Sequence, residues 1–163
     1  MDDKQAEKTA TDIRNLGVKS IAAKTDLTNW ENAQDTVQRG LSEFGSIDIL
    51  VNNTGWAMDR LFVDKPRSER EQEVAINFWG FINGIRAVID HMIERKQGSI
   101  VSIGSDAGRM GEYREAVYVG CKGGIIALIK AIARENGRYR IRLNFICPRL
   151  TPGKLDECSD KSL

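Results

Sequence analysis

The sequence offers little material for several common kinds of functional site. It contains a single histidine, His91, which lies in an apolar stretch of a predicted long helix, so a Ser-His-Asp triad is not indicated. The three cysteines are odd in number and fit no Cys-x-x-Cys pattern (Cys121, Cys147 and Cys158). We therefore predict neither a disulfide framework nor a metal site.

The sequence also has almost no net charge and no long apolar run. Acidic and basic residues leave a formal charge of +1, which gives no reason to expect nucleic acid or an anionic membrane as a partner. The longest strongly apolar stretch, around 124–133, is interrupted by Lys130 and is too short to span a bilayer. The start, Met1-Asp2-Asp3-Lys4, is polar and unlike a signal peptide, so a cytoplasmic location is predicted.

What the sequence does contain is typical of one globular domain. Its 163 residues are 41% apolar and 29% charged, which are ordinary proportions for a soluble protein. No internal repeat or linker is visible, and we assign residues 1–150 to a partial Rossmann-like domain. Residues 151–163 contain Pro152, Gly153 and a polar run, and are predicted to be a disordered tail.

Helical and strand-like patterns alternate along the chain. Helices are expected at 3–16, 28–44, 67–95 and 114–136, and strands at 18–24, 47–51, 99–103 and 141–146. Thr28 and Glu31 are placed for a capping box, and the apolar strand 47–51 is typical of a strand covered on both faces. The alternation predicts an α/β fold with a doubly wound, mostly parallel sheet.

The stretch 105–122 combines residues that are suited to proton transfer. Tyr118 and Lys122 stand four residues apart in a predicted helix, so their side chains lie one turn apart on one face. A neighbouring ammonium would lower the pKa of the phenol toward neutrality. Ser105 follows the predicted strand 99–103, at the carboxyl edge where open α/β sheets bind ligands. A Tyr-x-x-x-Lys motif alone also fits two solvated residues on an exposed helix.

Two further motifs give this stretch its context. Asn52-Asn53-Thr54-Gly55 follows a predicted strand, and Asn77 lies inside the next helix. Together with the serine, tyrosine and lysine above, these motifs resemble the short-chain dehydrogenase/reductase family in order and spacing, over about Ala6 to Pro148. The stretches 52–56 and 115–124 look most like bacterial hydroxyacyl-CoA dehydrogenases and 3-oxoacyl reductases.

The resemblance implies an NAD(P)-dependent oxidoreductase that interconverts a secondary alcohol and a ketone, with a hydroxyacyl or oxoacyl thioester as one candidate substrate. Tyr118 would be the general acid and base, and Lys122 would lower its pKa and hold the cofactor ribose. Ser105 would orient the carbonyl, and Asn77 would anchor a water linked to Lys122. The other interpretation is a chance match of a surface tyrosine, a solvated lysine and two capping or turn residues.

The resemblance also implies a set of cofactor-binding residues, which comprises Tyr118, Lys122, Asp26, Leu27, Asn53, Thr54, Gly55 and Pro148. Thr54 departs from the family's commoner alanine. The residues alone leave simpler explanations open, because Asp26 fits a helix cap or solvated turn and Asn53 to Gly55 fits an ordinary turn. Gly120, Gly123 and Gly124 fit either close approach of a cofactor or close helix packing.

The family normally begins with a strand, a Gly-rich turn and a helix that bind the cofactor pyrophosphate, and no such turn is visible near this N-terminus. We therefore expect a chain that lacks the first βαβ unit and the C-terminal strand. Neither the choice between NAD and NADP nor the substrate is then predictable. Strand 47–51 would have an unpaired edge, so the chain is expected to be unstable alone or to associate.

Two functions stay open. One is the oxidoreductase, acting on a small-molecule alcohol or ketone. The other is a catalytically inactive truncated family member that acts only by association with intact subunits. Homo-oligomerisation is expected through helices 67–95 and 114–136. A generic nucleotide-binding module is disfavoured because the phosphate-binding turn is missing.

Overall fold

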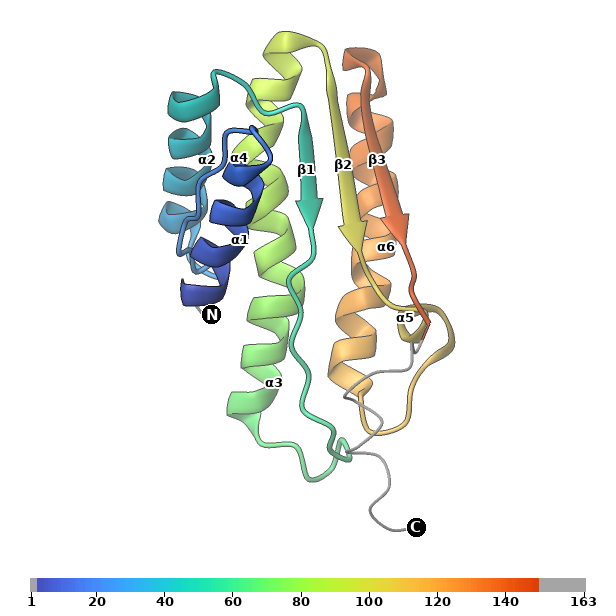
Figure 1. Cartoon of the computed structure of the whole chain (residues 1–163). Helices are drawn as coiled ribbons and strands as arrows, with labels where there is room; N and C mark the ends of the chain where they lie inside the picture. The colour runs from blue at the N-terminus through green and yellow to red at the C-terminus, as the bar shows by residue number, and fades with distance from the viewer. Residues whose placement is uncertain (1–2, 150–163) are drawn as a thin grey trace.

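A computed structural model describes residues 3–149 and places three strands in one parallel sheet (Figure 1). The strands lie in the order β1 Ile49–Asn52, β2 Gly98–Ile103, β3 Ile141–Ile146. Leu50, Ile100 and Leu143 form one row across the sheet. The predicted α/β, Rossmann-like fold is confirmed, whereas the predicted tail at 151–163 lies outside the described residues.

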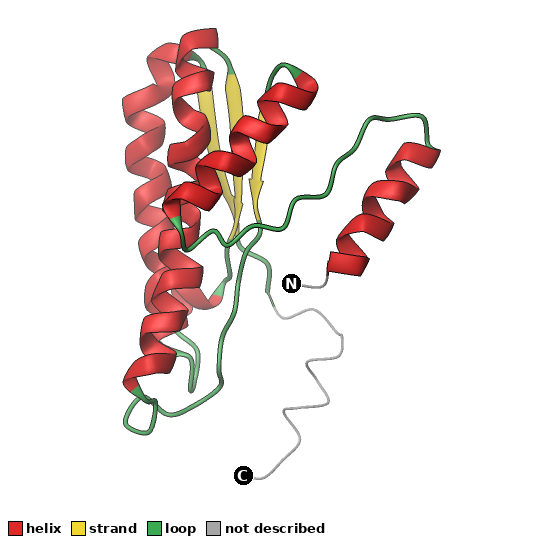
Figure 2. Cartoon of the chain, turned by 90° about the vertical axis from the view of Figure 1, so that its left-hand side faces the viewer, coloured by secondary structure: helices red, strands yellow, loops and turns green. Residues whose placement is uncertain are grey.

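Two long helical segments cover one face of the sheet. The predicted helix 67–95 is one continuous rod, which consists of α3 Arg67–Val74, the π-helical turn η1 Ala75–Trp79 and α4 Gly80–Arg95. Helix α6 Ala116–Asn136 lies beside it, and Figure 2 shows both against the same face. The remaining helical elements are α1 Asp3–Asn15, α2 Trp30–Phe44, α5 Ala107–Met110 and η2 Gly137–Tyr139.

The core lies between the sheet and these two helical segments. Its buried side chains are Phe81, Ile85, Val88 and Met92 of α4, Ile125 and Ile129 of α6, and Ile100 and Ile141 of the strands. Spacings of three and four residues put the helical members on one face, and burying each side chain contributes about 1.5–3 kcal/mol. This core fixes the carboxyl ends of the strands, from which the site is built.

The N-terminal segment departs from the sequence prediction. Residues 18–24 form no strand, because a strand needs a neighbouring strand and none of those in residues 3–149 pairs with this segment. Helix α2 is capped by Asn29, whose side chain accepts a hydrogen bond from Asn32 N at 2.8 Å. The predicted capping box of Thr28 and Glu31 is therefore wrong. Thr28 instead donates to Asp26 through its backbone N–H and its hydroxyl.

Strand β1 is an exposed edge strand. Ile49 and Val51 are 64% and 58% exposed, so the prediction that strand 47–51 is covered on both faces is wrong. Leu50 and Asn52 point to the other face, toward the helices, as the two-residue period of a strand requires. Within residues 3–149, β1 pairs with β2 alone, which leaves the predicted unpaired edge.

Candidate active site

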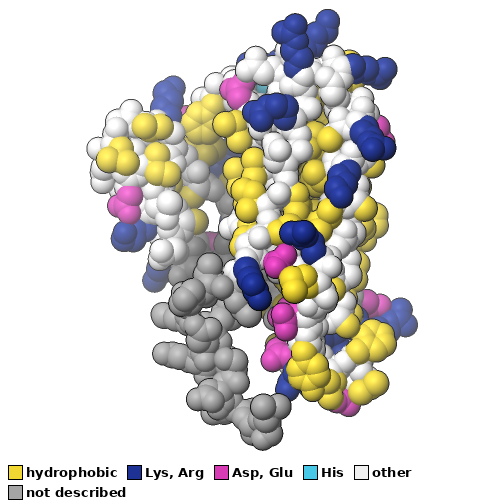
Figure 3. Space-filling model, turned by 90° about the vertical axis from the view of Figure 1, so that its right-hand side faces the viewer, with side chains coloured by type: hydrophobic (Ala, Val, Ile, Leu, Met, Phe, Trp, Pro, Cys, Tyr) yellow, Lys and Arg dark blue, Asp and Glu magenta, His cyan; other side chains and the backbone are white. Residues whose placement is uncertain are grey.

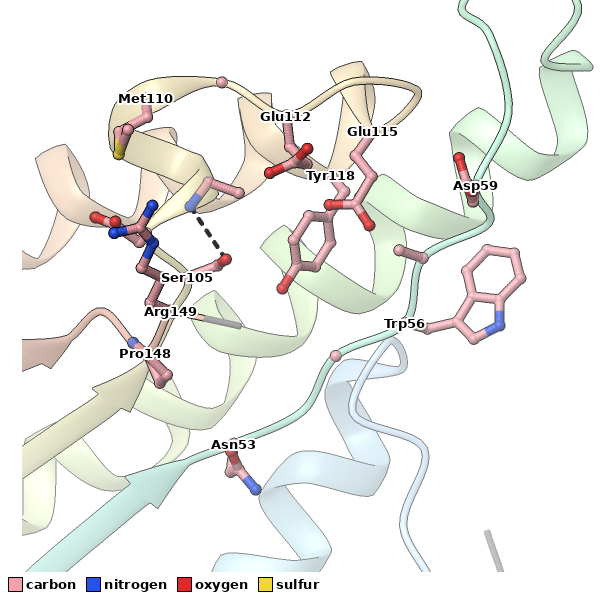
Figure 4. A pocket seen from close by; sticks show the side chains of 16 residues that line it. Asn53, Trp56, Asp59, Ser105, Met110, Glu112, Glu115, Tyr118, Pro148 and Arg149 are labelled. Atoms are coloured by element: carbon pink, nitrogen blue, oxygen red, sulfur yellow. Dashed lines mark hydrogen bonds between the residues drawn. The ribbon is translucent and has the colours of Figure 1, made fainter. Parts of the chain in front are cut away.

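The carboxyl ends of β1 and β2 open into a cavity of about 660 Å³ (Figure 4). Its walls come from the loops after β1 and β2, the start of α6 and the segment after β3. The predicted site residues Asn53, Gly55, Ser105, Tyr118 and Pro148 all line it. The fold therefore brings together residues from separate parts of the chain at the sheet edge where Rossmann-like folds bind ligands.

Ser105 and Tyr118 face this cavity from two elements. Ser105 lies just after β2, and its Oγ accepts a hydrogen bond from Ala107 N at 3.2 Å (dashed in Figure 4). Tyr118 lies in the first turn of α6, with its phenol oxygen directed toward Ser105. A substrate oxygen between the two side chains could hydrogen-bond to both hydroxyls.

The pKa of Tyr118 is raised above its ordinary value. Burial is the largest cause because it disfavours the charged phenolate, the hydrogen bond with Ser105 acts in the opposite direction, and the Glu115 carboxylate raises the pKa further. The expectation that Lys122 lowers this pKa is not met. Tyr118 is therefore held in its proton-donating form at neutral pH.

Lys122 lies one turn beyond Tyr118 and is only 2% exposed. Its Nζ is 5.4 Å from the centroid of the Tyr118 ring and 4.5 Å from that of Phe81. It donates a hydrogen bond to Thr54 O at 3.4 Å, so it touches the loop after β1. Burial lowers the pKa of Lys122 to about 8 because the ammonium is poorly solvated there.

Asn77 is fully buried in the π-helical turn η1. Its Oδ1 accepts a hydrogen bond from Trp56 N at 3.1 Å, and its Nδ2 donates to Glu73 O at 2.9 Å and to Trp56 O. A Cβ on Gly55 would stand 3.6 Å from Asn77 Oδ1 and 3.7 Å from Lys122 Nζ. Asn77 thus braces the loop after β1, and its role in holding a water stays a prediction.

A buried ion pair that sequence reasoning missed fixes the same loop. Lys65 Nζ donates to Glu73 Oε1, and both side chains are buried. The same Oε1 accepts a hydrogen bond from Met58 N at 2.9 Å. Glu73 therefore helps to hold the cavity wall that runs from Trp56 to Asp59. The segment 67–74 is so rich in charge that it reads as a solvent-facing helix, so the sequence carried no signal for this pair.

Glu115 lines the cavity and was also missed by the sequence reasoning. Four carboxyl side chains line the cavity, namely Asp59, Asp106, Glu112 and Glu115. Asp59 pairs with Arg114 at 2.9 Å and Asp106 with Arg109 at 3.6 Å, whereas Glu115 has no ion-pair partner within residues 3–149. Burial, followed by the nearby Glu112 carboxylate, raises the pKa of Glu115. Its position three residues before Tyr118 was the available signal.

The predicted cofactor residues fall into two groups. Asn53, Gly55, Tyr118 and Pro148 line the cavity, and Thr54 and Lys122 lie beside it, joined by their hydrogen bond. Asp26 and Leu27 do not line it and lie in the turn before α2. There the hydrogen bonds from Thr28 lower the pKa of Asp26, and Leu27 O accepts a hydrogen bond from Asn83 Nδ2 at 2.8 Å.

Two of the three glycines on α6 are explained by helix packing. A Cβ on Gly123 would stand 3.0 Å from Gly108 O, and one on Gly124 would stand 3.1 Å from the Phe78 ring. A Cβ on Gly120 would meet no atom within 4 Å. Close approach of α5 and Phe78 therefore accounts for Gly123 and Gly124 without a ligand.

The residues present fit the ribose end of a nicotinamide cofactor. An ammonium has three donors, and Thr54 O is the acceptor found for Lys122 among residues 3–149. Gly55 places no side chain between this amine and the loop, and the Tyr118 phenol lies on the same side of α6. A ligand with neighbouring hydroxyl groups would satisfy these donors.

Comparison with known proteins agrees with this geometry. The family model described as short chain dehydrogenase matches residues 1–161. The 3-oxoacyl-(acyl-carrier-protein) reductase FabG of Staphylococcus epidermidis is 32% identical over 144 residues, which are 88% of this chain and 59% of that protein. The oxidoreductase UcpA of Salmonella typhimurium is 36% identical over 145 residues, which are 88% of this chain and 55% of that protein.

A solved structure extends the similarity to three dimensions. The structure of NAD+-bound xylitol dehydrogenase superposes with a TM-score of 0.92 and 33% identity, over 97% of this chain and 62% of that one. The chain therefore spans about six tenths of the length of the relatives it matches. The family match, the fold and the Ser105–Tyr118–Lys122 arrangement lead to one conclusion: the chain belongs to the short chain dehydrogenase family.

Proposed function

We propose that this protein is an NAD(P)-dependent oxidoreductase that interconverts a secondary alcohol and a ketone, with Tyr118 as general acid and base. One observation carries the proposal: the Ser105 hydroxyl and the Tyr118 phenol converge on one cavity, and the buried Lys122 contacts the Tyr118 ring. Relatives that are named as a 3-oxoacyl reductase and a xylitol dehydrogenase agree with chemistry between an alcohol and a carbonyl.

In the reducing direction, the ketone oxygen would accept hydrogen bonds from Ser105 Oγ and Tyr118 Oη. The raised pKa of Tyr118 keeps the phenol protonated at neutral pH, so it can donate its proton as the alcohol forms. The nicotinamide supplies the hydride when bound. The reverse reaction requires the phenolate, so oxidation is expected to be faster in alkaline solution.

The cofactor would be NAD or NADP, held at its ribose by Lys122 and Tyr118 beside Thr54 and Gly55. This part of the proposal is supported by the buried lysine, which has donors to spare in a position next to the phenol. A hydroxyacyl or oxoacyl thioester and a simpler hydroxy ketone are both candidate substrates. A cytoplasmic location, without nucleic-acid or membrane partners, belongs to the same proposal.

Titration with NADH and with NADPH, followed by nicotinamide fluorescence, tests this function. A saturable signal with at least one of the two is expected. Tyr118→Phe should lose turnover by at least about a hundredfold, because it removes the hydroxyl that moves the proton, while a saturable signal remains through Lys122 even though one ribose contact is lost. Absence of saturable binding at millimolar cofactor would overturn the enzyme proposal for this chain.

We also propose association through the surface formed by α3, α4 and α6, either as a homo-oligomer or, in the alternative function, as an inactive subunit beside intact ones. The expectation that the apolar stretch around 124–133 is too short to span a bilayer is corrected here, because the helical segment Ala116–Tyr139 that contains it is long and apolar enough by length and composition. Little of this segment is buried. Trp79, the last residue of η1 and the one before α4, is 53% exposed. Both features favour a helix packed from another chain. Sedimentation of an Ala127→Arg variant tests this, with loss of association as the expected result.

A further inference from the structure

Glu115 occupies a special place in the cavity. It directly precedes the first residue of α6, and Figure 4 shows its carboxylate beside the Tyr118 ring, on the side away from Ser105. A substrate whose oxygen binds Ser105 and Tyr118 would reach Glu115 with a substituent that extends past the Tyr118 ring. Because Glu115 also raises the pKa of Tyr118, the two side chains interact electrostatically.

The other charges that line the cavity are paired, exposed or on a different wall. Asp59 and Asp106 are engaged by arginines, and the exposed Glu112 accepts a hydrogen bond from Tyr113 N at 3.1 Å. Arg149 is the one cation among the described lining residues, and it lies on the Ser105 side of the cavity. The wall beside Tyr118 is therefore negative, and its half-buried charge is that of Glu115.

We propose that Glu115 determines substrate class at this site, by accepting a hydrogen bond from a hydroxyl group next to the reacting carbon and by rejecting substrates that carry a carboxylate or phosphate there. The inference rests on the proposed function, because it places the reacting carbon beside Tyr118. The substrate class is then an uncharged hydroxy ketone or its diol. A thioester whose charges lie many bonds from the carbonyl is compatible with this rule.

The chemistry of the carboxylate supports both halves of the proposal. An ionised carboxylate is an acceptor only, so an uncharged hydroxyl is a matched donor for it. A second anion at the same place would meet a like charge in a partly buried site, where the repulsion is stronger than in bulk water and salt screens it only in part. The other carboxylate beside Tyr118, that of Glu112, is exposed, and segment 56–57 of the same wall is uncharged, so Glu115 is the half-buried group that makes this selection.

A matched pair of four-carbon ketones tests the inference. Acetoin carries a hydroxyl beside its ketone, whereas acetoacetate carries a carboxylate. Binding is followed by amide NMR shifts of Asn53 and Trp56 in the loop after β1, which needs no turnover. We expect the protein to bind acetoin about tenfold more tightly than acetoacetate at low salt, the effect of one nearby like charge. The Glu115→Gln variant should bring this ratio to within about twofold.

The control is Glu94→Gln, which removes the same charge from an exposed position in the last turn of α4 and should leave the ratio unchanged. High salt should weaken the rejection of acetoacetate in the parent protein and not in Glu115→Gln, a response that a purely structural role would not give. Four outcomes would each overturn the inference. The parent protein could bind both ketones equally, bind neither, or bind acetoacetate more tightly through Arg149. The fourth is a binding ratio that stays unchanged in Glu115→Gln. Turnover is measured in a separate assay. A protein without turnover would contradict the oxidoreductase proposal, whereas the binding ratio of the two ketones would still test the role of Glu115.

Discussion

At the scale of single residues, the buried Lys122 ammonium lowers the stability of the folded protein. Its ammonium is buried against two aromatic rings and has one backbone carbonyl as its partner among residues 3–149. A buried cation without a paired anion is costly, since it gives up hydration. We interpret this cost as the price of keeping free donors beside Tyr118.

The buried amine predicts a specific pH dependence of stability. The pKa of Lys122 falls from 10.5 to about 8 on folding, so between these pH values the unfolded chain holds a proton that the folded chain has released. The free energy of unfolding should therefore rise with pH through this window. Lys122→Met should remove this rise and increase the free energy of unfolding at pH 7 by on the order of 1–3 kcal/mol, while abolishing turnover.

Urea denaturation of both proteins at several pH values measures this effect. The difference between the two curves isolates Lys122 from other groups that titrate in the same range. Lys130→Met is the control, because Lys130 is exposed on the same helix and should show no such effect. A parent protein that is more stable than Lys122→Met at pH 7 would contradict the cost assigned to the buried ammonium.

At the scale of elements, the Lys65–Glu73 pair connects α3 to the cavity wall. Lys65→Met or Glu73→Leu alone leaves one buried charge unpaired and should cost about 3–5 kcal/mol. Replacing both by apolar residues should recover most of this loss, because no charge is then buried. Chemical denaturation of the two single variants and the double variant measures these values.

Variants of the same pair can show whether Glu73 holds the cavity wall in place, apart from its effect on the stability of the whole protein. Lys65→Met with Glu73→Gln keeps an oxygen that can accept from Met58 N, whereas Lys65→Met with Glu73→Leu does not. The amide of Met58 should exchange slowly with solvent in the first double variant and rapidly in the second, at similar overall stability. Equal protection in both would show that Glu73 does not hold the wall.

The contact between α5 and α6 leaves no room for a side chain. A Cβ on Gly108 would stand 2.9 Å from Gly123 N and from the backbone carbon of Lys122, and backbone cannot yield as a flexible side chain can. Gly108→Ala should therefore destabilise the protein by about 1–3 kcal/mol and weaken substrate binding, because α5 follows Ser105 directly. Gly120→Ala in α6 is the matched control and should be neutral or slightly stabilising, which thermal melts of both variants will measure.

These elements also show what could be predicted from the sequence. Helices α4 and α6, strands β2 and β3 and the Ser105–Tyr118–Lys122 arrangement follow from periodicity and motif spacing, which are local properties. The strand expected at 18–24 fails because a strand depends on a partner that local sequence does not specify. The Lys65–Glu73 pair was hidden for a related reason, since polar residues reveal burial only through contacts distant in the chain.

At the scale of the whole molecule, the described sheet has two outer strands with one partner each. Ile49 and Val51 of β1 are exposed on the face away from the helices. At the other edge, a groove between β3 and α6 is lined by apolar residues such as Ile126 and Leu143, with basic residues at its rim. Figure 3 shows apolar side chains between Lys and Arg over this side of the molecule. Unpaired edges with apolar side chains favour strand pairing between chains.

The exposed β1 strand predicts how the protein behaves in solution. We expect association that grows with concentration, because pairing a second strand with β1 would satisfy its free backbone groups and cover Ile49 and Val51. The double variant Ile49→Lys with Val51→Lys should reduce this association, since charges on an edge strand oppose pairing. Analytical ultracentrifugation over a range of concentrations measures the effect, with Val63→Lys in an exposed loop as the control.

If the β1 variant associates as the parent does while Ala127→Arg is monomeric, the helical surface carries the association and the strand edge does not. If the parent is a monomer at every concentration and melts in one sharp transition, the free edge is no liability, and the prediction fails for both surfaces.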